Sequence, residues 1–88
     1  MSKVTIYTTR YCPFCVRAKM LLEYKGQAFD EIPVDADPIR RAEMQERSGR
    51  HTVPQIWIQD QHVGGCDELF ALEMSGELDA WIEGVHHE

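Results

Sequence analysis

Two short stretches, Val4-Thr5-Ile6-Tyr7 and Cys12-Pro13-Phe14-Cys15, decide how this chain folds. The first alternates in the manner of a β-strand, with Val4 and Ile6 on one face. The second opens a run with helical spacing that extends from residue 13 to about residue 24. Two cysteines three residues apart therefore lie at a strand-to-helix junction, an arrangement typical of thiols that exchange a disulfide.

The position of each cysteine predicts its chemistry. Pro13 suits the first position of a helix, where its missing N–H costs nothing, so Cys12 falls at the N-cap. The unpaired N–H groups and the positive end of the helix dipole would favour the thiolate of Cys12 and make it a good leaving group. Cys15 lies one turn further in, and we expect it to be covered and protonated, as suits a resolving thiol. We therefore predict that Cys12 and Cys15 form a redox-active pair.

Size and composition are those of one small domain. With 88 residues, of which 43% are hydrophobic, the chain can build a single core over residues 1–88. It has three cysteines and no secretory leader pattern, which argues against a secreted disulfide scaffold and predicts a reducing cytoplasm. No apolar run approaches the roughly 18 residues of a membrane span, so we expect no membrane partner.

The net charge of −6 is unevenly distributed. Residues 1–22 hold four Lys or Arg and no Asp or Glu, whereas the rest hold five Lys or Arg against fifteen acidic residues. The basic segment either supports the Cys12 thiolate and attracts an anionic substrate, or is simply a solvated helix face. Residues 51–88 contain no Lys or Arg, which argues against a nucleic-acid partner, and we expect none.

Further elements follow from periodicity and capping signals. We expect strands over residues 3–8, 28–34 and 55–59, a turn at Asp60-Gln61 and a short strand at 62–63. Helices are expected over 13–24, over 38 to about 48 between Asp37 and Gly49, and from Asp67 onward with a break at Ser75-Gly76. The order β-α-β-α-β-β-α requires a right-handed parallel crossover followed by an antiparallel hairpin. The predicted fold class is α/β, with a four-stranded mixed sheet flanked by helices.

Three motifs resemble the glutaredoxin family in order, spacing and total length. They are Cys12-Pro13-Phe14-Cys15, Thr52-Val53-Pro54-Gln55-Ile56 and Gly64-Gly65-Cys66-Asp67-Glu68-Leu69. The chain also has an extra cysteine, Cys66, with Arg47-Ser48-Gly49-Arg50 upstream. These features make it similar to the bacterial type called glutaredoxin three.

This resemblance implies the thioredoxin fold and glutathione-dependent thiol–disulfide oxidoreductase activity. The expected substrates are protein disulfides and glutathione mixed disulfides. Glutathione is expected as the reducing co-substrate, with no bound cofactor. The expected partners are glutathione and disulfide-bearing or glutathionylated proteins, and we expect the protein to act as a monomer.

The resemblance also implies part of a glutathione site around Thr52, Val53 and Pro54. In the family the proline that matches Pro54 is cis, and it would lie opposite Cys12. The Val53 backbone could then pair with the extended tripeptide and present its sulfur to Cys12. An ordinary proline at the start of a strand is the alternative.

Gly65, Cys66 and Asp67 are implied to bind the γ-glutamyl end. Glycine lets the backbone approach a ligand closely, and a helix N-terminus offers N–H groups to a carboxylate. By resemblance, the N–H groups of Cys66 and Asp67 take the carboxylate, and the Asp67 side chain pairs with the ammonium. Asp67 could also simply cap the helix.

The glycyl carboxylate needs a cation, for which Arg41 is the candidate because arginine can form two parallel bonds with a carboxylate. A solvated Arg40/Arg41 pair is the alternative. The family often has lysine at the position of Thr9. The neighbouring Arg10 would point the other way on an extended segment. Phe14 replaces a common tyrosine and would form an exposed apolar rim beside Cys12.

The remaining chemically active side chains give weaker predictions. Cys66 is either an inert buried thiol or an oxidisable one, and its place at a helix start should lower its pKa. Trp57 and Trp81 have the periodicity of core residues. The four histidines show no metal-binding pattern, so no metal site is predicted.

Two other functions are compatible with a Cys-X-X-Cys motif. One is a carrier of a glutathione-ligated [2Fe–2S] cluster, against which Pro13 argues because cluster-binding relatives usually have a small residue there. The other is a thioredoxin-like dithiol protein reduced by a flavoenzyme, against which the glutathione-pocket motifs argue.

Overall fold

The structure is a computed structural model that describes residues 3–84. The helices and strands are, in chain order, β1 (Val4–Thr8), α1 (Pro13–Tyr24), β2 (Phe29–Pro33), α2 (Pro38–Ser48), β3 (Gln55–Ile58), β4 (Gln61–Gly64), α3 (Cys66–Met74) and α4 (Leu78–Glu83). Of the helices in this part of the chain, none is long and apolar enough to span a bilayer.

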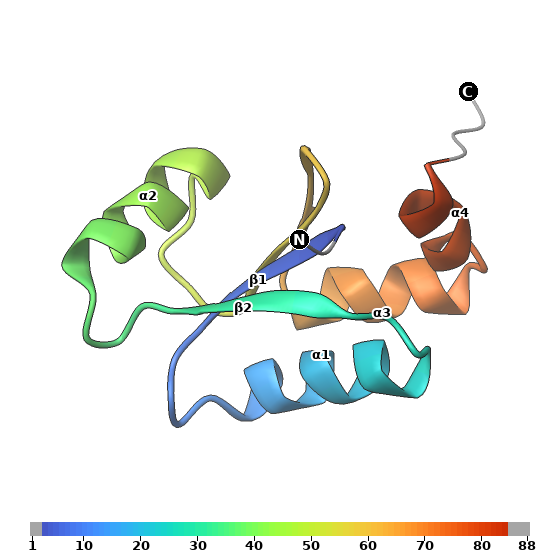
Figure 1. The fold of residues 1–88 in the computed structure, drawn as a ribbon, viewed down its shortest axis with the longest axis horizontal. Coiled ribbons are helices and arrows are strands. Elements are labelled where there is room, and N and C mark those ends of the chain that lie inside the picture. Colours follow the sequence, from blue (N-terminus) through green and yellow to red (C-terminus); the bar gives the residue numbers. More distant parts are fainter. Residues whose placement is uncertain (1–2, 85–88) are drawn as a thin grey trace.

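The four strands form one mixed sheet in the order β2-β1-β3-β4. β1 pairs in parallel with β2 and antiparallel with β3, and β3 pairs antiparallel with β4. Helices α1 and α3 cover one face, and α2 lies against the other (Figure 1). The predicted fold class is confirmed.

Each face of the sheet has its own apolar core because side chains alternate along the strands. Val4 and Ile6 of β1 pack with Ile56 and Ile58 of β3 against α1, α3 and α4. Tyr7 and Trp57 lie on the opposite face and pack with Val34 and Met44 under α2. The larger cluster fixes α1 and α3, which carry the chemically active residues, against the sheet.

Capping residues set the helix boundaries as predicted. α1 spans residues 13–24, and Gly26 follows it with φ of 68°. Asp37 caps α2 by accepting a hydrogen bond from the Arg40 N–H at 3.1 Å, and Gly49 ends α2 with φ of 71°. The final helical region breaks between α3 and α4, at the predicted Ser75-Gly76.

Other predicted boundaries were wrong by a residue or more. β1 and β2 are shorter than residues 3–8 and 28–34. The hairpin turn lies at Gln59-Asp60, with Gln59 at a φ of 55°, and β4 already begins at Gln61. α3 begins at Cys66 with Gly65 as its N-cap, so Asp67 is a first-turn residue and not the cap.

Candidate active site

Cys12 lies at the N-cap of α1 and Pro13 at its first position. The Cys12 backbone is extended, with φ of −123° and ψ of 102°, and its Sγ accepts a hydrogen bond from the Cys15 N–H at 3.1 Å. The two cysteines are joined by a disulfide, with their Cα atoms 5.2 Å apart. The N-cap geometry thus places a backbone donor directly on the Cys12 sulfur.

The two cysteines differ in their access to solvent. Cys12 is 8% exposed and Cys15 only 1%. Phe14, between them, is 53% exposed and forms the predicted apolar rim. A substrate sulfur can therefore approach Cys12 alone, whereas Cys15 is placed to react with a sulfur already attached to Cys12.

The loop before β3 lies against Cys12. The Val53–Pro54 peptide bond is cis, as the resemblance implies. The Cys12 Sγ lies 3.7 Å from the Val53 carbonyl oxygen. Among the described residues, the Val53 N–H has no hydrogen-bond partner. This backbone donor is thus available to an extended ligand beside the reactive sulfur.

A cavity of about 280 Å³ opens between this loop, the start of α1 and the start of α3. It includes seven of the eight residues expected to bind glutathione, namely Phe14, Thr52, Val53, Pro54, Gly65, Cys66 and Asp67. The eighth, Arg41, is not among the lining residues, and its Nη1 lies 3.5 Å from the His51 carbonyl oxygen. The structure therefore brings together every residue that was expected to bind glutathione except this arginine.

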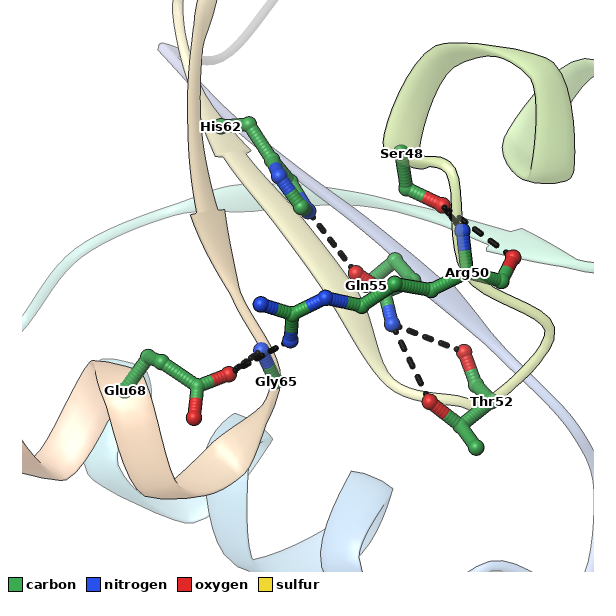
Figure 2. A network of polar contacts seen from close by, with 7 residues as sticks. All are labelled: Ser48, Arg50, Thr52, Gln55, His62, Gly65 and Glu68. Carbon is green, nitrogen blue, oxygen red and sulfur yellow. Dashed lines mark hydrogen bonds and ion pairs between the residues drawn. The ribbon is translucent and has the colours of Figure 1, made fainter.

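Arg50 and Glu68 also line the cavity, and neither was among the predicted site residues. The Arg50 Nη1 lies 2.9 Å from the Glu68 Oε1, which also accepts the Gly65 N–H at 2.7 Å (Figure 2). The Gly65 N–H and the Arg50 guanidinium hold the pKa of Glu68 below its ordinary value. The sequence signal was the place of Arg50 two residues before Thr52, just after Gly49 ends α2.

A buried glutamine supports the loop from beneath. The Gln55 Nε2 donates to the Thr52 carbonyl oxygen at 3.0 Å and to the Thr52 Oγ1 at 3.3 Å. Its Oε1 lies 2.8 Å from the Nε2 of His62 on β4, so His62 donates this bond (Figure 2). Burial, followed by the nearby Arg50 cation, lowers the pKa of His62. The Gln55 amide thus ties the Thr52 side of the cavity to β4.

Cys66 differs from the sequence prediction. Its side chain is 4% exposed and belongs to the core cluster, although the residue also lines the cavity. Burial raises the pKa of the Cys66 thiol, and this effect exceeds the lowering caused by Arg17. The expectation that the helix start would lower its pKa was wrong, because the loss of solvent around the buried thiol disfavours the thiolate more than the nearby positive charge favours it.

The basic residues of the first 22 positions do not line the cavity. Lys19 pairs with Glu31 at 3.0 Å, and the guanidinium of Arg17 lies over the Phe70 ring. The Arg10 backbone N–H donates to the Asp35 carboxylate at 3.1 Å. These contacts match a solvated helix face more closely than an anion-binding surface around Cys12.

The two tryptophans and the histidines account for the remaining predictions. Trp57 is buried and Trp81 packs against the larger core cluster, as predicted. His86 and His87 lie outside the described residues. Within residues 3–84, no three His, Cys, Asp or Glu side chains gather closely enough to hold a metal ion.

Comparisons with known proteins show the family of this chain. The Glutaredoxin family profile matches residues 4–63. The chain is 58% identical over 82 residues to a glutaredoxin of Pseudomonas aeruginosa, covering 93% of this chain and 98% of that one. It is 56% identical over 83 residues to glutaredoxin 3 of Escherichia coli K12, covering 94% and 100% of the two chains.

Solved structures show the same fold. The solution structure of a Brucella melitensis glutaredoxin is 55% identical, has a TM-score of 0.85, and is matched over 100% of this chain and 96% of that one. A buckwheat glutaredoxin–glutathione complex is 25% identical and has a TM-score of 0.87, over 96% and 79% of the two chains. Together with the dithiol at the N-cap of α1, these likenesses identify the chain as a member of the glutaredoxin family, a thiol–disulfide oxidoreductase.

Proposed function

We propose that this glutaredoxin reduces glutathione mixed disulfides and protein disulfides, with glutathione as the electron donor. The observation that carries the proposal is a cavity beside Cys12 that contains a cis-proline loop and the start of α3. Such a cavity offers main-chain donors to an extended peptide together with first-turn N–H groups for a carboxylate. The buckwheat relative, a glutathione complex by its description, has the same fold.

For a glutathione mixed disulfide, the Cys12 thiolate attacks the glutathione sulfur. A bond forms between Cys12 and glutathione, and the substrate cysteine leaves as a thiolate that takes a proton from water. A second glutathione thiolate then attacks the attached glutathione sulfur. Glutathione disulfide forms, and Cys12 leaves as the thiolate that the Cys15 N–H stabilises.

For a protein disulfide, Cys12 attacks one sulfur and the other leaves as a thiolate. Cys15, once deprotonated, attacks the Cys12 sulfur in the mixed disulfide, which releases the second substrate thiol. The Cys12–Cys15 disulfide that forms is the state in the structure. Two glutathiones then reduce it and are themselves oxidised to glutathione disulfide. We place this cycle in the cytoplasm, where the glutathione pool is reducing, and assign it to a monomer.

The test compares Cys12→Ser with Cys15→Ser on two substrates, a glutathionylated peptide and a protein disulfide. We expect Cys12→Ser to abolish both activities, because only Cys12 is accessible to a substrate sulfur. Cys15→Ser should retain reduction of the glutathionylated peptide and lose reduction of the protein disulfide. Equal loss in both variants on the glutathionylated peptide would contradict this division of roles.

The comparisons do not favour the two alternative functions, since the relatives with 56–58% identity carry glutaredoxin names. A cluster carrier would be coloured after anaerobic purification. A flavoenzyme-reduced dithiol protein would turn over with thioredoxin reductase in the absence of glutathione. We expect a colourless protein that depends on glutathione, and either opposite result would support the corresponding alternative.

A further inference from the structure

The charged residues of the cavity raise the question of which cation meets a ligand carboxylate. Among its lining residues in the described chain, Arg50 is the one lysine or arginine, and Asp67 and Glu68 are the acidic residues. Without Arg50 the cavity would present two carboxylates and no cationic side chain. Glutathione carries two carboxylates and one ammonium, so such a lining would leave its carboxylates to backbone N–H groups beside two like charges.

Arg50 is fixed on the α3 side of the cavity. Its side chain extends from the segment after α2 to the first turn of α3, where it meets Glu68 at 2.9 Å (Figure 2). Glu68 is itself held by the Gly65 N–H. A carboxylate that the backbone anchors therefore holds the guanidinium at the first turn of α3, the turn that also carries Asp67. The contact with Glu68 engages one nitrogen of a group with five donors, and the side chain is 49% exposed, so a ligand can reach it.

We propose that Arg50 is a specificity-determining residue that pairs with the α-carboxylate of a γ-glutamyl group while Asp67 pairs with its ammonium. This inference rests on the proposed function, because it concerns how the same cavity recognises glutathione. The ammonium and the carboxylate of that group are bonded to one carbon, so a neighbouring cation and anion can recognise them together. Glu68 is a positioning residue that acts through Arg50.

The test uses one cysteine peptide in two forms, joined by a disulfide either to glutathione or to cysteinylglycine, which lacks the γ-glutamyl group. The second-order rate constant for reaction with the reduced protein is measured for each form in a single turnover. The ratio of the two rate constants is the discrimination. The variants are Arg50→Met, Arg50→Lys and the matched control Arg40→Met. Arg40 also pairs with a glutamate, Glu43, at 3.1 Å, but on α2 and outside the cavity.

We expect Arg50→Met to lower the rate constant for the glutathionyl peptide about three- to tenfold, as for a partly exposed charged contact, and to leave the cysteinylglycyl peptide unchanged. Arg50→Lys should give an intermediate loss because it keeps the charge but not the planar fork. Arg40→Met should match the wild type. Added salt should reduce the discrimination of the wild type, a readout that requires no variant.

Three results would overturn the inference. Full wild-type discrimination in Arg50→Met would show that Arg50 does not meet the γ-glutamyl group. An equal loss on both peptides would show general damage in place of specificity. If the wild type discriminates and its discrimination does not respond to salt, the recognition is not ionic. In each of these cases the proposed function stands, whereas a wild type that reacts equally with both peptides would overturn the glutathione site itself.

Discussion

Each residue of the Cys12-Pro13-Phe14-Cys15 motif has a role set by its place in the first turn of α1. The N-cap residue carries the sulfur that we propose as the attacking one, and the first-turn N–H of Cys15 donates to it at 3.1 Å. The donor belongs to the backbone, so it stays in place as the charge on sulfur changes. The same turn buries Cys15 and exposes Phe14, which separates the proposed resolving thiol from the exposed rim.

The buried position of Cys66 predicts low reactivity. Because burial raises the pKa of its thiol, we expect Cys66 in the reduced protein to react with iodoacetamide at least about tenfold more slowly than Cys12 at neutral pH. Mass spectrometry of peptides after timed alkylation measures both rates. In denaturant the two rates should converge, because the difference depends on the fold. A native Cys66 that is alkylated as fast as Cys12 would contradict the burial argument.

Most of the residues that line the cavity could be predicted from the sequence, but its cationic residue could not. The motifs located the two cysteines, the proline loop and the Gly65-Cys66-Asp67 segment because each has a characteristic local sequence. Arg41 and Arg50 both lie in or just after α2, and nothing in the sequence says which one turns toward the cavity. That choice depends on the Gly49 turn and on Glu68, a partner 18 residues away from Arg50.

At the scale of elements, the junction between β4 and α3 is the most constrained part of the site. Gly64 has a φ of 118°, and a Cβ placed on it would lie 2.5 Å from the Glu68 Oε1. A side chain at Gly64 would thus combine backbone strain with displacement of the carboxylate that holds Arg50 and Gly65.

We predict that Gly64→Ala lowers the free energy of unfolding by more than about 2 kcal/mol. The matched control is Gly76→Ala, between α3 and α4, where φ is 80° and, apart from the neighbouring residues, no atom of residues 3–84 lies within 4 Å of the added Cβ. The control should lose about 1 kcal/mol, from backbone strain alone. Urea unfolding monitored by circular dichroism measures both. Equal losses would show that the space occupied by Glu68 contributes nothing.

Element boundaries were predictable where a side chain or a glycine signals them. Asp37 and Gly49 delimit α2 as expected because one accepts a backbone hydrogen bond and the other adopts a left-handed conformation. The hairpin turn was misplaced because Gln59, which carries the positive φ, is not a typical turn residue. The start of α3 was misplaced because Gly65 caps it without a side chain.

At the scale of the molecule, a series of side-chain contacts connects α2, on one face of the sheet, with the loop that lines the cavity. The Trp57 ring contacts both the Arg47 guanidinium of α2, 4.4 Å from the ring centroid, and the His62 ring, with the two ring centroids 4.6 Å apart. His62 is hydrogen-bonded to Gln55, and Gln55 in turn donates to Thr52, which lines the cavity (Figure 2). The strand order and the two cores were predictable from alternation, whereas this chain of contacts was not, because it joins residues with no shared motif.

We predict that His62 makes the stability of the fold depend on pH. Burial and the Arg50 cation hold the pKa of His62 in the folded protein below its ordinary value of 6.5. Above pH 6.5 neither state binds the proton, whereas below it the unfolded chain is protonated first, so the free energy of unfolding falls as the pH drops toward the folded pKa. His62→Gln, which keeps a donor for Gln55, should flatten this slope, while the control His51→Gln, at an exposed loop position, should retain it. The midpoints of urea unfolding of the wild type and both variants, measured between about pH 7.5 and pH 5.5, give the three slopes. If His62→Gln keeps the wild-type slope, the proton is taken up elsewhere and the neutral His62–Gln55 bond does not support the fold.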